Sequence, residues 1–122
     1  MTGQDARSHE GDPSPGGYVA VCLEGDIRNG QQRRFAVAGR DILLVGAGGR
    51  VFALANRCPH MAKPLDGGRV TGMSFTCPVH AAQFDLETGR SIGFPKTGPL
   101  QRFDVRIENG RIFVGVERNG PD

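Results

Sequence analysis

The sequence is poor in the residues that several common kinds of site require. Of its 122 residues, three are histidine, three are cysteine, one is tyrosine and none is tryptophan. No apolar run approaches the roughly 18 residues of a membrane-spanning helix, so we expect no membrane partner. The net charge of +2, without any run of lysine or arginine, also argues against nucleic-acid binding. The first residues contain neither an apolar export core nor a twin-arginine pair, which favours a cytoplasmic protein.

The cysteines are odd in number, which argues against a disulfide framework. Cys22 lies in an apolar run, where a buried, unreactive thiol is the usual interpretation. Each of the other two cysteines is followed within three residues by a histidine, an arrangement that chance rarely produces with so few histidines. The two pairs are Cys58 with His60 and Cys77 with His80.

Short β-like runs separated by turn residues make up the chain from Tyr18 onward, and no segment keeps a helical apolar period. We therefore predict one all-β domain at residues 17–118, an antiparallel β-sandwich or barrel, after a disordered tail at residues 1–16. Tight turns are predicted at Gly46–Gly49 and Asn109–Gly110. The predicted strands are Tyr18–Glu24, Arg33–Val37, Ile42–Val45, Val51–Asn56, Arg69–Thr71, Met73–Thr76, Gln83–Leu86, Leu100–Ile107 and Ile112–Glu117.

Two loop segments interrupt this strand pattern, and each carries one Cys/His pair near its start. They are Arg57–Gly68 and Cys77–Ala82. The hairpin predicted between them would return the second pair toward the first. We therefore expect a small sub-domain formed by these two loops, at about residues 57–99, which brings the two Cys/His pairs together as one binding site.

The pattern Cys-x-His, then sixteen residues, then Cys-x-x-His suits a two-iron cluster with mixed ligands. Thiolates match an iron–sulfide core, while neutral imidazoles donate less charge and so favour the reduced state. We expect Cys58, His60, Cys77 and His80 to bind a [2Fe–2S] cluster, with each loop supplying one ligand to each iron. Tetrahedral zinc uses the same residue types, but its sites more often combine C-x-x-C with a separate histidine pair.

These motifs resemble those of the Rieske family, and the resemblance runs from about Tyr18 to Glu117. Beyond the four ligands it includes Leu65, Phe84-Asp85 and Thr88-Gly89. It implies a Rieske-like fold in which the cysteines bind the buried iron and the histidines bind the iron nearer solvent. Two positions where the family often has glycine, which permits a positive φ, are alanines here, Ala62 and Ala81.

The resemblance also indicates which kind of Rieske protein this is. Quinol-oxidising members carry an extra cysteine in each loop and two hydroxyl donors to the cluster, from serine and tyrosine. The corresponding residues here are Lys63, Val79, Ala82 and Phe84, which supply neither a disulfide nor a hydroxyl. Hydrogen bonds to sulfur raise the reduction potential, so we expect a potential near the low end of the Rieske range, about −150 mV.

A low potential suits a one-electron carrier between an NAD(P)H-dependent flavin reductase and a terminal oxygenase. The folded region has no spare histidine for a two-histidine, one-carboxylate iron site, so we expect an electron carrier and not an enzyme. We also expect the carrier to be a monomer. Two other interpretations stay open. One is a Rieske-like small subunit of a nitrite reductase-type complex, and the other is a metal-stabilised interaction module.

Overall fold

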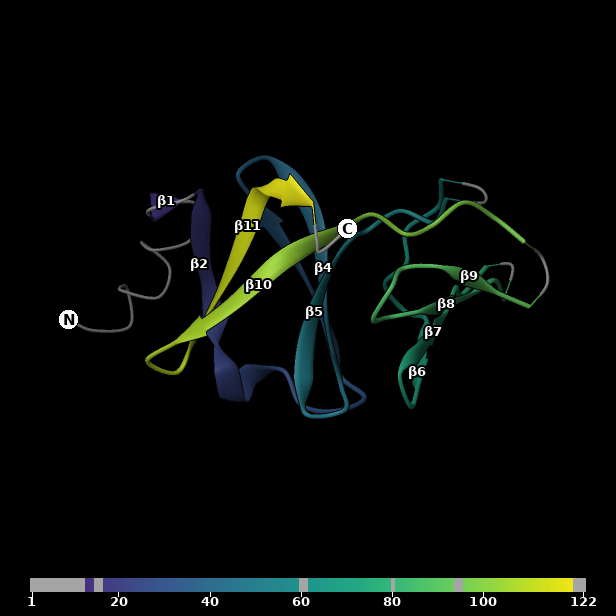
Figure 1. The fold of residues 1–122 in the computed structure, drawn as a ribbon, viewed down its shortest axis with the longest axis horizontal. Coiled ribbons are helices and arrows are strands. Elements are labelled where there is room, and N and C mark those ends of the chain that lie inside the picture. The colour runs from purple at the N-terminus through teal and green to yellow at the C-terminus, as the bar shows by residue number, and fades with distance from the viewer. Residues whose placement is uncertain (1–12, 15–16, 60–61, 80, 94–95, 120–122) are drawn as a thin grey trace.

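A computed structural model describes residues 13–14, 17–59, 62–79, 81–93 and 96–119. These residues form two antiparallel sheets and one short 3-10 turn, η1 (Glu24–Asp26), as Figure 1 shows. The larger sheet has the order β1 (Pro13–Ser14), β2 (Tyr18–Leu23), β11 (Arg111–Asn119), β10 (Arg102–Glu108), β5 (Arg50–Ala55), β4 (Arg40–Ala47) and β3 (Gln32–Val37). The smaller sheet has the order β6 (Arg69–Thr71), β7 (Ser74–Thr76), β8 (Gln83–Asp85) and β9 (Ser91–Ile92).

The larger sheet, without β1, curls into a near-closed antiparallel barrel of six strands, and the smaller sheet lies beside it, next to β4 and β5 (Figure 1). This confirms the predicted all-β fold. Two tight turns take the form expected from their residues. Asn109 and Gly110 have φ values of 53° and 76°, and Gly48 and Gly49 have values of 60° and 76°. Two successive positive φ angles are what a two-residue hairpin of the favoured twist requires.

Strand β4 is covered on both faces, and this explains its unbroken apolar sequence. Ile42 and Leu44 pack into the barrel core, while Leu43 and Val45 pack into a second core beneath the smaller sheet. All four side chains are fully buried. A strand buried on both faces has no solvent side on which polar residues would alternate, so it appears in the sequence as a continuous run.

The second core joins the two sheets. The barrel contributes residues of β4 and β5, including Phe52 and Leu54, and the smaller sheet contributes Phe75 and Phe84. Burying a large apolar side chain of this kind stabilises the fold by about 1.5–3 kcal/mol. The smaller sheet is therefore held to the barrel by apolar packing.

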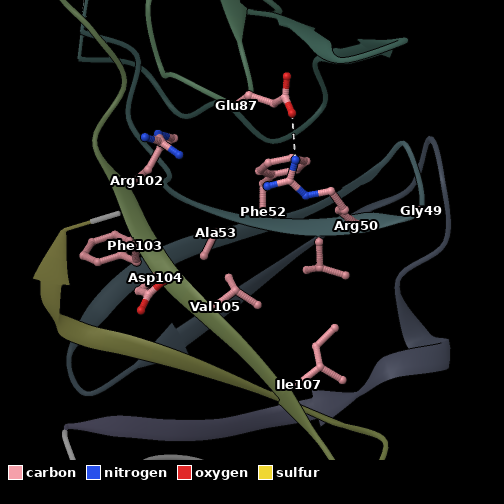
Figure 2. A pocket seen from close by; sticks show the side chains of 11 residues that line it. Gly49, Arg50, Phe52, Ala53, Glu87, Arg102, Phe103, Asp104, Val105 and Ile107 are labelled. Atoms are coloured by element: carbon pink, nitrogen blue, oxygen red, sulfur yellow. Dashed lines mark hydrogen bonds and ion pairs between the residues drawn. The ribbon is translucent and has the colours of Figure 1, made fainter. Parts of the chain in front are cut away.

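A polar contact also crosses this junction (Figure 2). Arg50 of β5 forms an ion pair of 2.7 Å with Glu87, which follows β8, and its guanidinium lies 4.8 Å from the centroid of the Phe52 ring. The two side chains border a cleft of about 260 Å³ between the barrel and the turn after β8. Both remain more than half exposed, at 58% and 51%. An exposed pair of this kind contributes under about 1 kcal/mol, so the apolar core dominates the junction.

The observed strands agree with the predicted ones to within about two residues at most of their ends. Strand β9 was not expected, because two residues are too short to carry an alternating pattern. Two residues of the predicted tail, Pro13–Ser14, pair with β2 as strand β1, and the rest of residues 1–16 lie outside the described residues. In the described part of the chain, no helix has the length and apolar character needed to cross a membrane.

Candidate metal centre

Two of the four predicted ligands, Cys58 and Cys77, lie in the core between the sheets. Cys58 follows β5 and Cys77 follows β7, and their exposed fractions are 0% and 2%. They form no disulfide. The other two predicted ligands, His60 and His80, lie outside the described residues, so the complete ligand set stays a prediction.

The two cysteine loops share one backbone hydrogen-bonding pattern. In each, the cysteine N–H donates to the carbonyl oxygen five residues later, and the N–H four residues later donates to the cysteine carbonyl. The two distances are 2.7 and 2.6 Å in the Cys58 loop and 2.7 and 3.1 Å in the Cys77 loop. The same local geometry therefore presents both thiols, although the loops are far apart in the sequence.

The surroundings of these thiols suit a metal cluster. Ala82 and Phe84, both fully buried, belong to the same core and offer no side-chain group that could compete with a thiol. Cys77 also borders a groove of about 630 Å³, together with Pro78 and the exposed Val79, so one side of the site meets solvent. A thiolate alone in an apolar core would be unfavourable, whereas soft iron–sulfide chemistry stabilises it.

Asn56, which directly precedes the first loop, is a functional candidate that the sequence analysis did not identify. Its exposed fraction is 5%, and among the described residues it is the one polar side chain that is buried. Its Oδ1 accepts hydrogen bonds from the N–H groups of Leu65 and Asp66, at 2.7 and 2.9 Å. Its Nδ2 donates to the carboxylates of Asp66, at 2.8 Å, and of Asp41, at 3.3 Å. A polar residue at the end of an apolar strand was the available indication in the sequence.

Asp41 is itself held by an arginine on the neighbouring strand. The guanidinium of Arg34 donates to both carboxylate oxygens of Asp41, at 2.8 and 3.0 Å. This side-chain hydrogen bond, followed by the charge of Asp41, raises the pKa of Arg34. The two hydrogen bonds from Arg34 orient the Asp41 carboxylate beside Asn56.

The end of the first loop contacts two strands. Gln32 of β3 binds it by hydrogen bonds, and it also lies close to β7, the strand that leads into the second loop. Gln32 donates from Nε2 to the Gly68 carbonyl at 2.7 Å and accepts at Oε1 from the Gly67 N–H at 2.8 Å. A Cβ atom on Gly68 would lie 2.3 Å from the Thr76 carbonyl oxygen and 2.6 Å from the Phe75 ring. Glycine is therefore required at position 68 for the two loop segments to approach each other.

The other residues of the resemblance lie in this core or in the turn after β8. Leu65 and Phe84 are fully buried. In the turn, the Gly89 N–H donates to the Asp85 carbonyl at 2.6 Å, and the Gly89 carbonyl accepts from the Leu100 N–H at 2.8 Å. These bonds join the smaller sheet to the segment that returns to the barrel.

Comparison with known proteins identifies the family. Residues 17–104 match the family model described as the Rieske [2Fe-2S] domain. The chain belongs to the Rieske family. Membership implies a Rieske-type [2Fe–2S] cluster, which the two buried thiols in matched loops can hold.

Relatives of this Rieske domain include both small and large proteins. The ferredoxin component of the naphthalene 1,2-dioxygenase/salicylate 5-hydroxylase systems of Ralstonia sp is 34% identical, over 80% of this chain and 93% of the relative. Apoptosis-inducing factor 3 of Homo sapiens is 38% identical over 87% of this chain, which spans only 18% of that protein.

Solved structures with this fold include two ferredoxins. The ferredoxin of carbazole 1,9a-dioxygenase from Nocardioides aromaticivorans IC177 has a TM-score of 0.74 and 28% identity, covering 86% of this chain and 98% of its own. A chain in a complex of reduced oxygenase and oxidised ferredoxin in carbazole 1,9a-dioxygenase has a TM-score of 0.78 and 26% identity, covering 88% of this chain and 99% of its own.

The two alanines that replace family glycines adopt the backbone conformation that glycine favours. Ala62 and Ala81 occupy the same place in their Rieske loops and both have φ of 58°. For a residue with a Cβ atom, the left-handed conformation costs about 1–2 kcal/mol. Alanine therefore preserves the loop geometry, as expected from its small size, and each loop carries some backbone strain.

We predict that Ala62→Gly and Ala81→Gly leave the fold intact and stabilise it slightly. Relief of about 1–2 kcal/mol of strain outweighs the roughly 0.4–1 kcal/mol that glycine adds through the freedom of the unfolded chain. The matched control is Ala82→Gly, because Ala82 is fully buried and does not have a positive φ, so the same change removes packing only. Chemical denaturation of the cluster-loaded proteins should give opposite signs for the two kinds of variant. Equal destabilisation by all three would contradict the strain assignment.

Proposed function

We propose that this chain is a Rieske ferredoxin that passes single electrons from an NAD(P)H-dependent flavin reductase to a terminal oxygenase. The observation that carries the proposal is the pair of buried cysteines in matched loops, within a domain that corresponds to nearly the full length of ferredoxin components. This chain matches a ferredoxin component, the electron-transfer part of a dioxygenase system, over 93% of that component's length. It is therefore a carrier of electrons and not a catalytic subunit.

Terminal oxygenases are supported as partners by the complex in which a similar ferredoxin chain accompanies its oxygenase. The reductase follows from electron counting. A nicotinamide delivers a hydride, which carries two electrons, whereas a [2Fe–2S] cluster carries one electron at a time. A flavin can take the pair and release the electrons singly, so a flavin reductase is the chemical class of donor that we propose.

Four side chains would hold the cluster in this proposal. Cys58 and Cys77 would bind one iron through thiolates, and His60 and His80 would bind the other through imidazoles. The bound cluster supplies a site that accepts and returns one electron. The apolar side chains packed around the two cysteines limit the access of water to the thiols, and the groove that Cys77 borders leaves one side of the site open to solvent.

We predict that His60→Ala and His80→Ala each abolish cluster binding, because each iron needs two terminal ligands from the protein. Cys22→Ser is the matched control. Cys22 lies on β2 and packs against the barrel core, away from the second core, so its loss should leave the cluster in place. Iron content and the visible spectrum of each purified variant measure the outcome. An intact cluster in either histidine variant would overturn the ligand assignment.

The absence of two hydroxyl groups sets the expected potential. Ala82 and Phe84 are fully buried in the core that contains both cysteines. We predict a midpoint near about −150 mV, and a higher value for the double variant Ala82→Ser with Phe84→Tyr, since hydrogen bonds to sulfur stabilise the added electron. An EPR-monitored redox titration of anaerobically purified protein measures both. A high reduction potential in the unchanged protein would favour quinol oxidation. Bound zinc without any cluster signal would contradict the carrier proposal.

A second candidate is a domain that serves one fixed partner, such as a small subunit of a nitrite reductase-type complex. The observation that favours it is the relative in which the same domain forms 18% of a much longer protein. A diffusing carrier must find its partner by itself, and complementary charge accelerates such encounters. The dependence of electron transfer on salt therefore separates the two candidates.

We predict that Lys63→Glu combined with Lys96→Glu slows electron transfer to the oxygenase about tenfold at low salt and flattens its salt dependence. Both lysines are exposed within the predicted sub-domain, so they suit docking onto an acidic partner surface. The matched control reverses the same number of charges, at Arg106 and Arg111, on the β10–β11 hairpin whose turn is remote from the smaller sheet in Figure 1. Stopped-flow rates over a salt series are the measurement. Identical behaviour of the two double variants would contradict charge-guided docking.

A further inference from the structure

The two cysteine loops share local hydrogen bonds, yet their ends are joined in different ways. The Cys77 loop lies between β7 and β8, and these strands pair directly, with Thr76 opposite Gln83. The ladder therefore closes this loop at its base. The Cys58 loop begins after β5 and ends before β6, and these two strands belong to different sheets. No strand pairing joins its ends.

The side chain of Asn56 occupies the place of the missing ladder. Its Oδ1 receives the N–H groups of Leu65 and Asp66, near the end of the loop, while its own backbone lies at the start. Its Nδ2 donates to the Asp66 carboxylate at 2.8 Å, so three hydrogen bonds connect the two ends of the loop. A ladder between two strands would supply bonds of the same kind at the same point.

Asn56 also ties the closed loop to the barrel. Its backbone N–H donates to the Asp41 carbonyl at 2.9 Å, and its Nδ2 contacts both Asp41 carboxylate oxygens at 3.3 Å. Asp41 lies on β4 and is held by Arg34 of β3. Through these hydrogen bonds, the position of the Cys58 loop is fixed relative to β4 and β3 of the barrel.

An amide is the group that this position requires. It must accept two N–H donors on one side and donate to two carboxylates on the other, and an asparagine side chain has two donors and one doubly accepting oxygen. A carboxylate at position 56 would accept the same N–H groups but would face Asp41 and Asp66 as a third negative charge. An alanine would leave the buried N–H of Leu65 and the partly buried N–H of Asp66 without their acceptor.

We propose that Asn56 is a positioning residue that closes the Cys58 loop in place of a β-ladder and so fixes Cys58 relative to Cys77. The role of the fixed thiol rests on the proposed cluster function. Gln32 extends the same arrangement, because it holds the next two residues, Gly67 and Gly68, by their backbone groups. The first loop thus depends on side-chain contacts to the barrel, while the second depends on the backbone of its own hairpin.

The test compares Asn56→Ala and Asn56→Asp with the double variant Asn56→Asp, Asp66→Asn, in the full chain loaded with its cluster. The double variant exchanges the amide and the carboxylate, so the bond between the two positions can form again with its direction reversed. Asn29→Ala is the matched control. Asn29, which lies between η1 and β3, also accepts a backbone N–H at its Oδ1. The donor is Gly49, at 2.9 Å, in the β4–β5 turn of the barrel.

Two measurements are made on every variant. Amide hydrogen exchange is followed at Leu65 and Asp66, at the end of the first loop, and at Gln83, at the end of the second. The release of iron to a chelator is followed through the visible spectrum. A residue that only stabilised the whole fold would accelerate exchange at all three amides, whereas a loop-closing residue acts on the first two.

In Asn56→Ala we expect exchange at Leu65 and Asp66 to be faster by about tenfold or more, with Gln83 little changed, because a buried hydrogen-bond partner is lost. Iron release should accelerate by a similar factor, and the control should match the unchanged protein. The double variant Asn56→Asp, Asp66→Asn should release iron more slowly than Asn56→Asp alone, because the hydrogen bond between positions 56 and 66 can form again. Unchanged exchange at Leu65 and Asp66, uniform acceleration at all three amides, or equal release in the single and exchanged variants would overturn the proposal.

If Asn56→Ala does not fold, Asn56→Asp and the exchanged pair carry the same comparison. The proposed function fails separately from this inference. A cluster-loaded protein that gives no electrons to an oxygenase would refute the carrier role, while amide exchange and iron release would still test the closure of the loop. A chain that binds no cluster would refute the carrier role through its spectrum, and amide exchange would still report on Asn56.

Discussion

The structure depends on one hairpin, β4–β5, whose two faces are both buried. One face completes the barrel core, and the other forms the floor of the core that contains Cys58 and Cys77. Because the strands alternate their side chains between the two faces, a shift of register by one residue would exchange the two cores. The barrel and the cysteine loops are therefore fixed to each other by the same eight- and six-residue strands. Only Asn56 and Arg57 separate the end of β5 from Cys58, so the first loop starts directly at the barrel.

The site combines an ordinary packed core with an unusual local backbone. The thiols are presented by two loops with the same backbone hydrogen bonds and an alanine of positive φ at the same place. The ends of the Cys77 loop are joined by strand pairing, whereas those of the Cys58 loop are joined by the side chain of Asn56. The strain at Ala62 and Ala81 persists because the surrounding bonds over-determine the loops. The two loops lie with the smaller sheet at one end of the molecule (Figure 1). The groove that Cys77 borders opens toward solvent. Buried thiolates and an accessible edge are the two requirements of a protein that must protect a cluster and still exchange electrons with a partner.

The comparisons show how this domain is used elsewhere. It corresponds to 93% of a ferredoxin component and to 18% of a much longer protein. Apolar packing joins the two cores of this domain within one chain, and a domain built in this way can occur in both contexts. The Arg50–Glu87 pair contributes little to holding the domain together because it is exposed, whereas the second core supplies most of the junction.

Features that depend on neighbouring residues could be predicted from the amino-acid sequence alone. Alternating and continuous apolar runs predicted most strands, Asn109-Gly110 predicted a hairpin, and the two Cys/His spacings predicted the cluster, because each of these patterns is complete within a few residues. The roles of Asn56 and Gly68 follow only from the folded chain. Asn56 bonds to residues ten and fifteen positions away, and Gly68 is required by its contact with Thr76, a backbone group on another strand. No pattern of neighbouring residues encodes such contacts, since Asn56 meets Asp41 only when β4 and β5 have paired, and Gly68 meets Thr76 only when β6 and β7 have paired.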